Sequence, residues 1–164
     1  MTSAERNRRD DSGAEVSDAE GAPPVSDMRV AVTLDVPSDV RYIERIVSLV
    51  ANQAAELDFA PRQVKLNLPV ALSEALANAM LRGNAEDRSK PVHVRATFDG
   101  RDLVLEIVDQ GHGFDLDDCS SVDPTLPENL LREDGRGLFL MQRLMDRVER
   151  FTRDGNVVRL TLHR

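Results

Sequence analysis

Glu74, Asn78 and Arg82 stand in a segment, SEALANAMLRGN, whose spacing predicts a helix. Glu74 and Asn78 are four residues apart, so they share one helix face and can meet the same ligand, and Arg82 lies only slightly off that line. The carboxylate could act as a general base, the amide oxygen could hold magnesium and the guanidinium could contact phosphate. A solvated helix face would show the same pair, so the pair alone does not decide between the two interpretations.

A second cluster, VDQGHGF, places an acid at the end of an apolar segment. Asp109 is followed by Gly111 and Gly113, and glycines let the backbone approach a ligand closely. An ordinary strand-to-loop turn has the same composition, so this cluster by itself is a weak indication of function.

A third cluster, Gly135-Arg136-Gly137, precedes a helix that is predicted to begin at Leu138. Free N–H groups and the positive end of the helix dipole would there face an anion. A flexible hinge before a helix would look the same. The cluster is not a P-loop, because the chain contains no G-x-x-x-x-G-K-[ST] motif.

Hydrophobic periodicity predicts the strands that position these clusters. Apolar residues alternate over residues 30–36 and 92–98, and a returning strand is predicted at 103–108. Asp99-Gly100 is a strong signal for a hairpin turn between the last two. The segment 103–108 is nearly continuous in apolar residues, which predicts a central place in the sheet.

Three segments show the helical spacing of apolar residues, and a final hairpin crosses Asp154-Gly155: the helices are 38–57, 67–83 and 138–148, and the hairpin is 151–162. Ser38 is predicted to cap the first helix, Pro61 to close that unit and Pro69 to lie in the first turn of the second helix. Hairpins dominate and helices are few. The sequence therefore predicts an α+β fold, a two-layer α/β sandwich with a mixed, mostly antiparallel sheet and helices on one face.

The composition of the chain narrows its class. The 164 residues carry a formal net charge of −8 and a single cysteine, and 41% of them are hydrophobic. The acidic balance argues against direct nucleic-acid binding and against attachment to an anionic membrane. One cysteine cannot form an internal disulfide, and no apolar run approaches the roughly 20 residues of a membrane span. We therefore predict a soluble domain in the cytoplasm.

Residues 1–27 differ from the rest of the chain, with seven acidic residues, three arginines and almost no bulky apolar side chains. Such a segment cannot bury enough surface to offset the entropy cost of ordering, so we predict a disordered acidic tail before one domain, residues 28–164. Within that domain, residues 110–134 lack periodicity. Loops of this length inside a compact domain are usually functional or disordered.

Taken together and in this order, the three clusters resemble the GHKL (Bergerat-fold) ATP-binding domain shared by histidine kinases, gyrases and certain chaperones. Within that family the chain is similar to the bacterial anti-sigma factor serine/threonine kinases of partner-switching systems. The resemblance rests on SEALANAMLRGN, VDQGHGF, DPTLPENLLREDGRGLFLMQRLMD and the final hairpin, and it covers residues 28–164. The stand-alone length, without histidine phosphoacceptor helices, favours the anti-sigma branch.

The resemblance implies a role for each matching residue. Glu74 matches the glutamate regarded as the general base, which takes the proton from the acceptor hydroxyl. Asn78 matches the asparagine that coordinates the Mg²⁺ bridging the phosphates. Asp109 matches the aspartate that accepts a hydrogen bond from the adenine amino group, and Gly111 and Gly113 match glycines that let the chain pass close to the base.

The resemblance also implies an ATP lid at about residues 114–134. Gly135 and Gly137 match the glycines that turn the lid over the phosphates, and Leu138 begins the helix whose N-terminus faces them. Two arginines are candidates for contact with the γ-phosphate, Arg132 and Arg136.

Two positions depart from the pattern of the family. Relatives often carry histidine where Arg82 stands, and an arginine can contact phosphate there but cannot titrate. Many relatives also place threonine beside the adenine-binding acid on the final hairpin, where this chain has Asn156, Val157 and Val158. How adenine recognition is completed is therefore left open.

The resemblance implies a kinase that uses ATP and Mg²⁺ to phosphorylate Ser or Thr of a STAS-domain anti-sigma factor antagonist, and that sequesters an RNA polymerase sigma factor. It also implies a homodimer, with residues 28–57 as the expected surface. The alternative is a non-catalytic, nucleotide-sensing regulatory module, which would not need Glu74. An ATPase subunit of a clamp or chaperone cycle would carry a transducer domain, for which this chain has no room.

Overall fold

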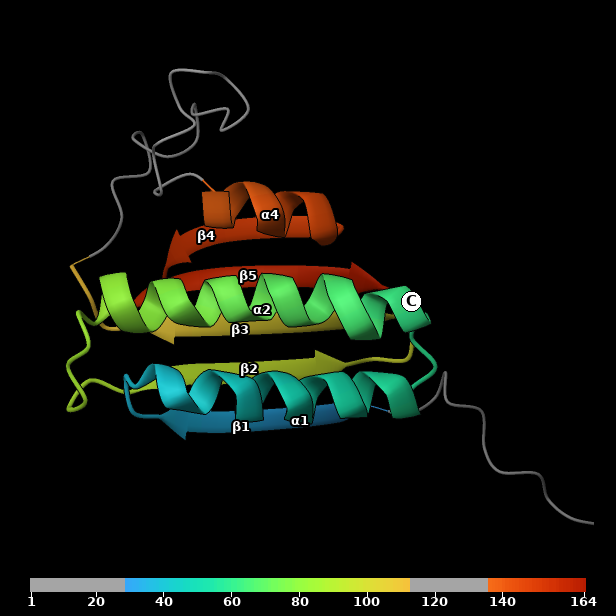
Figure 1. Ribbon diagram of the computed structural model, residues 1–164, viewed down its shortest axis with the longest axis horizontal. Helices are drawn as coiled ribbons and strands as arrows, with labels where there is room; N and C mark the ends of the chain where they lie inside the picture. The colour runs from blue at the N-terminus through green and yellow to red at the C-terminus, as the bar shows by residue number, and fades with distance from the viewer. Residues whose placement is uncertain (1–28, 113–135) are drawn as a thin grey trace, which may run out of the picture.

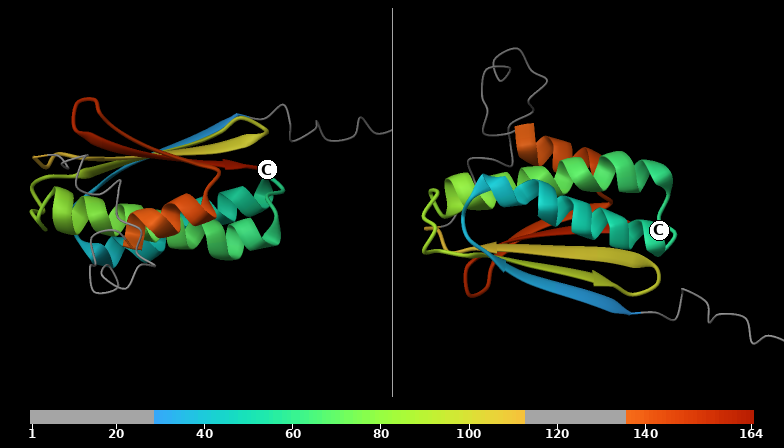
Figure 2. Two further views of the ribbon diagram at one scale, coloured as in Figure 1. Left: turned by 90° about the horizontal axis from the view of Figure 1, so that it is seen from above. Right: turned by 60° about the horizontal axis from the view of Figure 1, so that its bottom comes forward.

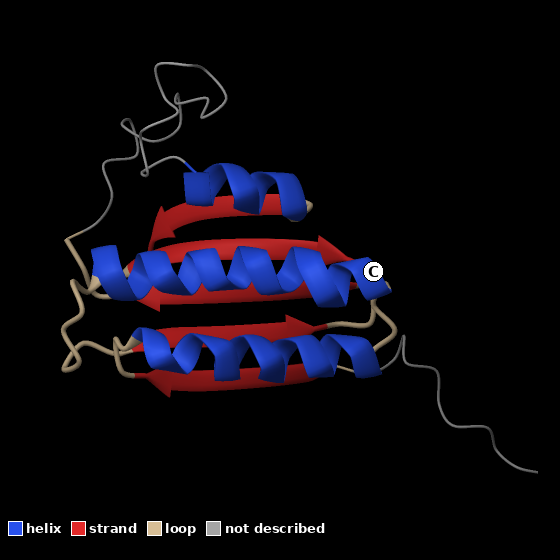
Figure 3. Ribbon diagram, in the orientation of Figure 1, coloured by secondary structure: helices blue, strands red, loops and turns tan. Residues whose placement is uncertain are grey.

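The computed structural model describes residues 29–112 and 136–164. In this part of the chain a sheet is covered by helices on one face only (Figures 1, 2 and 3). The elements, in chain order, are β1 (Val30–Val36), α1 (Ile43–Glu56), α2 (Leu68–Ala77), β2 (Val92–Phe98), β3 (Asp102–Asp109), α4 (Arg136–Leu144), β4 (Arg147–Thr152) and β5 (Asn156–His163). The predicted α+β two-layer sandwich is confirmed.

The five described strands form one sheet in the order β1-β2-β3-β5-β4, with every neighbouring pair antiparallel rather than mixed. β3 is the middle strand, as its apolar sequence predicts. Its helix-facing residues pair with buried residues of β5: Leu103 with Leu162, Leu105 with Leu160 and Ile107 with Val158. The same register sets Asp109 opposite Asn156. Because side chains alternate along a strand, Asp109 extends the helix-facing row beyond the apolar core.

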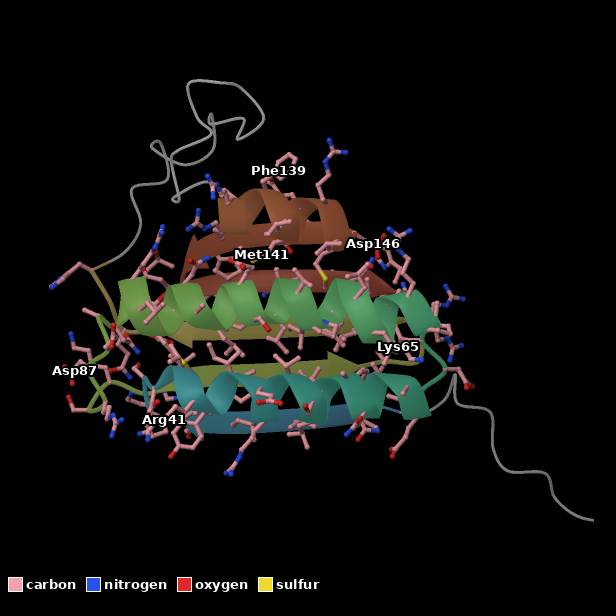
Figure 4. All side chains as sticks on the ribbon, in the orientation of Figure 1. Arg41, Lys65, Asp87, Phe139, Met141 and Asp146 are labelled. Carbon is pink, nitrogen blue, oxygen red and sulfur yellow. The ribbon has the colours of Figure 1, made fainter. Side chains whose placement is uncertain are left out.

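α2 is the central helix of the second layer, since it contacts both α1 and α4. Five of its residues have 0% of their surface exposed: Leu68, Ala71, Leu72, Ala75 and Leu76. Met141 of α4 is buried and lies on the side of that helix that faces α2, whereas Phe139 lies on the outer side (Figure 4). The alternation of leucine with alanine on α2 lets neighbouring elements approach closely while the leucines fill the core.

The start of the first helix differs from the prediction. A 3₁₀ turn (Val40–Tyr42) precedes α1, and Asp39 caps it by accepting a hydrogen bond from the backbone N–H of Arg41 at 3.1 Å. The hydroxyl of Ser38 instead donates to the carbonyl oxygen of Lys90 at 2.7 Å. The predicted cap at Ser38 is wrong because its hydroxyl donates to Lys90 and accepts from Nδ2 of Asn84, both in a distant segment.

The second helix begins earlier than predicted, and Pro61 opens it rather than closing the preceding unit. Helical backbone runs from Pro61 through a wide π-helical turn (Gln63–Asn67) into α2 and through a second such turn (Asn78–Gly83). In the first turn the N–H of Leu68 donates to the carbonyl oxygen of Gln63, five residues back. A wide turn of this kind accommodates the ring of Pro69 and its missing N–H without ending the helix.

The last helix also has other bounds than predicted. α4 spans Arg136–Leu144 instead of 138–148, because the N–H of Asp146 already bonds to the carbonyl oxygen of Thr161 in β5 at 3.0 Å. The predicted tail, residues 1–27, and the predicted lid, residues 114–134, lie outside the described residues. Within residues 29–112 and 136–164, no helix has the length and apolar character needed to cross a membrane.

Candidate functional site

Two of the sequence clusters meet where α4 begins. Glu74 lies on α2 and Asn78 on the wide turn that continues it, both half-buried. Gly137, in the first turn of α4, is buried against them: a methyl group in place of its hydrogen would lie 2.7 Å from Oε2 of Glu74 and 3.2 Å from Nδ2 of Asn78. A carboxylate and an amide therefore lie at the N-terminus of a helix, where its dipole attracts negative charge.

The carboxylate of Asp109 is 1% exposed and is held through one of its oxygens. Oδ1 accepts hydrogen bonds from the backbone N–H of Gly111 at 2.9 Å and from Nδ2 of Asn156 at 2.7 Å. The same Nδ2 donates to the carbonyl oxygen of Gly111 at 3.1 Å. The end of β3, the turn after it and the start of β5 are thus tied together around one buried charge.

Two glycines allow this packing. A methyl group at Gly83 would lie 2.4 Å from Cγ of Asp109, and one at Gly111 would lie 2.0 Å from the carbonyl oxygen of Gly83. No larger residue fits either position without moving backbone or the buried carboxylate. The end of the wide turn Asn78–Gly83 therefore rests directly on Asp109 and its turn.

Asn84 is a residue of the site that the sequence analysis did not single out. It is 0% exposed, and its Oδ1 accepts a hydrogen bond from the N–H of Gln110 at 2.7 Å. Its Nδ2 donates to Oγ of Ser38 and to the carbonyl oxygen of Lys90, both at 2.9 Å. The only local signal was a polar residue directly after the glycine that ends a helix.

The Glu74–Asn78 pair and the turn around Asp109 lie along one helical run, residues 61–83, and together they form what we call the strip. Glu74 and Asn78 lie at one end and Gly83, against Asp109, at the other, nine residues from Glu74. At the α-helical rise of 1.5 Å per residue nine residues span at most about 13.5 Å, and the wide turn makes the run shorter than that. The end of β3 and the start of α4 lie at the same end of the molecule, on the left in Figure 1.

An ion-pair network fixes the loops beside the strip. Hydrogen bonds from Arg41 hold the pKa of the Asp39 carboxyl well below its ordinary value of 3.8. Arg88, in the loop after the helical run, adds an ion pair to Oδ2 of Asp39 at 2.5 Å. Arg41 and Asp87, which directly precedes Arg88, lie at the same end of the molecule (Figure 4).

The remaining predicted residues are placed less closely. Arg82 lies in the wide turn just before Gly83 and has an exposed side chain, and Arg136 begins α4 and is also exposed. Leu138, in the first turn of α4, packs its side chain against the core. Three predicted residues lie outside the described residues: Gly113, Arg132 and Gly135.

The bare face of the sheet carries none of these residues. A shallow hollow of about 470 Å³ there is lined by charged side chains, among them Glu106, Arg153 and Arg159. Burial raises the pKa of the Glu106 carboxyl, but hydrogen bonds from Arg159 and Arg153 outweigh it and leave the pKa below its ordinary value. The described residues on either face include no group of three His, Cys, Asp or Glu side chains that could hold a metal ion.

Comparison with known proteins gives this architecture its class. The profile of the histidine kinase-like ATPase domain matches residues 36–162, which is most of the described chain. The chain belongs to the histidine kinase-like ATPase domain family, and the resemblance to GHKL domains that its motifs indicate is confirmed. Membership of an ATPase domain family implies ATP binding.

Individual relatives are protein kinases by name. The chain is 30% identical over 135 residues to the serine-protein kinase RsbW of Bacillus subtilis (strain 168), an alignment that covers 79% of this chain and 83% of that protein. The serine-protein kinases RsbW of Bacillus licheniformis and Bacillus velezensis are 30% and 28% identical over alignments of the same extent.

Proposed function

We propose that the protein is an ATP-dependent serine/threonine protein kinase and anti-sigma factor of the cytoplasm. It phosphorylates a STAS-domain anti-sigma factor antagonist and sequesters an RNA polymerase sigma factor. The observation that carries the proposal is the packing of Gly137 on Glu74 and Asn78, which joins a carboxylate, an amide and a helix N-terminus in one place. The names of the relatives, serine-protein kinases, support it.

The residues present fit an adenine nucleotide. Gly83 and Gly111 let the chain pack directly around Asp109, and the buried carboxylate of Asp109 offers an oxygen to an amino group. At the other end of the strip, the N-terminus of α4 provides backbone N–H groups and the exposed Arg136 for phosphate oxygens. An elongated ligand with a base at one end and phosphates at the other matches this arrangement.

The amide oxygen of Asn78 would hold Mg²⁺. This ion is usually bound by one or two protein ligands together with substrate phosphates, and when bound it neutralises charge that develops on them. Asn78 lies 3.2 Å from the position of a methyl group at Gly137, so the amide is beside the first turn of α4.

Glu74 would act as the general base. Its carboxylate would accept the proton of the acceptor Ser or Thr hydroxyl while the oxygen of that hydroxyl bonds to the γ-phosphorus and ADP leaves with the former bridging oxygen. Gly137 of α4 packs against Glu74, and this contact would hold the carboxylate at the end of the strip where we propose the phosphates bind. Positioning of this kind supplies most of the catalysis in phosphoryl transfer.

The substitution Glu74→Gln tests this role. It keeps the size of the side chain and removes its basicity, so transfer of label from ATP to a STAS-domain antagonist should fall by about 100-fold or more while ATP binding is retained. Glu56→Gln, an exposed position on α1, is the matched control. Unchanged transfer in Glu74→Gln would refute the base assignment. Binding without transfer in the wild type would favour the non-catalytic module.

The proposal includes a homodimer formed through residues 28–57. In the described sheet β1 is an edge strand, so one side of its backbone is open to pairing. The adjoining 3₁₀ turn and α1 expose three large apolar side chains, Val40, Tyr42 and Leu49, at 45%, 39% and 45%. An unpaired edge beside exposed apolar residues suits a symmetric contact between two copies.

A further inference from the structure

Asn156 uses one nitrogen to fix both sides of the turn that follows β3. Its Nδ2 donates to Oδ1 of Asp109 at 2.7 Å and to the carbonyl oxygen of Gly111 at 3.1 Å. An amide nitrogen carries two protons, so one side chain makes both bonds. A threonine hydroxyl has a single proton and can donate only one of them.

These bonds distinguish the two oxygens of Asp109. Oδ1 receives the N–H of Gly111 and the amide of Asn156, and within the described residues Oδ2 receives no hydrogen bond. Gly83 lies flat against the carboxylate: a methyl group there would be 2.7 Å from Oδ1 and 2.6 Å from Oδ2. The carboxylate is therefore fixed in orientation, with one oxygen used by the fold and the other left to accept.

We infer that Asn156 is the residue that sets the base preference of the site, by holding Asp109 so that Oδ2 meets a ligand amino group. This inference rests on the proposed binding of ATP at Asp109. An ionised carboxylate only accepts hydrogen bonds, so a purine with an amino group at position 6 is matched and one with a carbonyl oxygen there is repelled. Asn156 acts through Asp109, and is thus a positioning residue.

The probe is the pair ATP and inosine triphosphate, which differ at position 6 of the purine and in the proton on the neighbouring nitrogen. Dissociation constants of both are measured by calorimetry with the full-length protein. The wild type should bind ATP at least about tenfold more tightly, as expected for one mismatched buried hydrogen bond. Equal binding of the two nucleotides would overturn the inference, whatever the variants do.

Three substitutions separate positioning from simple support of the fold. Asn156→Ala removes both bonds and should reduce the ATP preference about tenfold. Asn156→Thr keeps one donor, so its preference for ATP should lie between those of the wild type and Asn156→Ala. Asn156→Asp has the same shape but sets a second carboxyl group against Asp109, where the two would share a proton and donate as well as accept, so it should show the smallest preference. Gln142→Glu, exposed on α4 and outside the proposed dimer surface, is the control for the added charge.

If Asn156 had a merely structural role, its substitution would weaken the binding of both nucleotides equally and leave the ratio of their dissociation constants unchanged. An unchanged ratio in folded Asn156→Ala or Asn156→Thr, with folding checked by circular dichroism, would therefore overturn the inference. Failure of the wild type to bind either nucleotide would instead refute the proposed function. The two failures are distinct because only the first requires a protein that binds ATP.

Discussion

The substitution Gly137→Ala should separate activity from stability. A methyl group at this position would lie 2.7 Å from Oε2 of Glu74, whereas ordinary contacts of a β-carbon begin at 3.4 Å. The carboxylate must therefore move by about 0.7 Å, the difference between these distances. Asn78 is displaced less, because its Nδ2 would lie 3.2 Å from the methyl group.

The expected effects on the rate of phosphoryl transfer and on the free energy of unfolding differ in direction. A misplacement of about 1 Å can cost a factor of about 100 in rate, so a shift of 0.7 Å should slow phosphoryl transfer by about 10- to 100-fold. Alanine is favoured over glycine in a helix by up to about 1 kcal/mol. Because the methyl group meets the mobile end of a side chain and not backbone, the free energy of unfolding should stay equal or rise.

The assay is single-turnover transfer of γ-phosphate label from ATP to a STAS-domain antagonist, with urea unfolding measured on the same samples. Gln142→Ala, an exposed position of α4, raises helix propensity without touching Glu74, and serves as the control with unchanged transfer. Transfer by Gly137→Ala within twofold of the wild type would refute the argument that α4 positions Glu74. A large loss of stability would refute the argument that the clash is confined to a side chain.

Three further substitutions test other parts of the structure. Asn84→Ala leaves the N–H of Gln110 without its acceptor and should lower the free energy of unfolding by about 1–3 kcal/mol in urea titration; no change would contradict its role as a tie. Because the pKa of Asp39 is lowered in the folded state, its carboxylate stabilises the fold above pH 3.8, its ordinary pKa, and this contribution is lost as the pH falls below that value. Asp39→Asn should therefore lose less stability than the wild type when unfolding is measured at acid pH. Parallel plots of stability against pH for the two proteins would contradict this. Leu49→Asp places a charge among exposed apolar residues and should yield folded monomers in sedimentation, with the circular dichroism spectrum of the wild type; a monomeric wild type would refute the dimer.

Local patterns in the sequence were sufficient where the period of the residues decides the structure. The alternation over 92–98 and the turn at Asp99-Gly100 specify a hairpin, and Gly100 adopts the positive φ of 87° that such a turn requires. The motifs around Glu74, Asp109 and Gly137 indicated the family for the same reason, since each is a short local pattern.

Contacts between distant segments decided what the sequence could not. Ser38 and Asp39 are both good helix caps, and the choice between them depends on Lys90, 52 residues away from Ser38. Asn84 is buried, and Ser38 and Gln110 form hydrogen bonds to it from other segments of the chain. No local pattern signals either contact.

The wide turn between Asn78 and Gly83 makes the length of this segment significant. In it the N–H of Asn84 donates to the carbonyl oxygen of Ala79, five residues back, so the turn holds one residue more than regular α-helical winding would. Each residue of an α-helix advances the azimuth by about 100°. The extra residue therefore changes the direction in which the residues after it face. Glu74, before the turn, faces α4, and Gly83, at its end, faces Asp109. Regular α-helical winding of the same residues would preserve every chemical group of the strip and turn Gly83 by about 100° around the helix, away from Asp109.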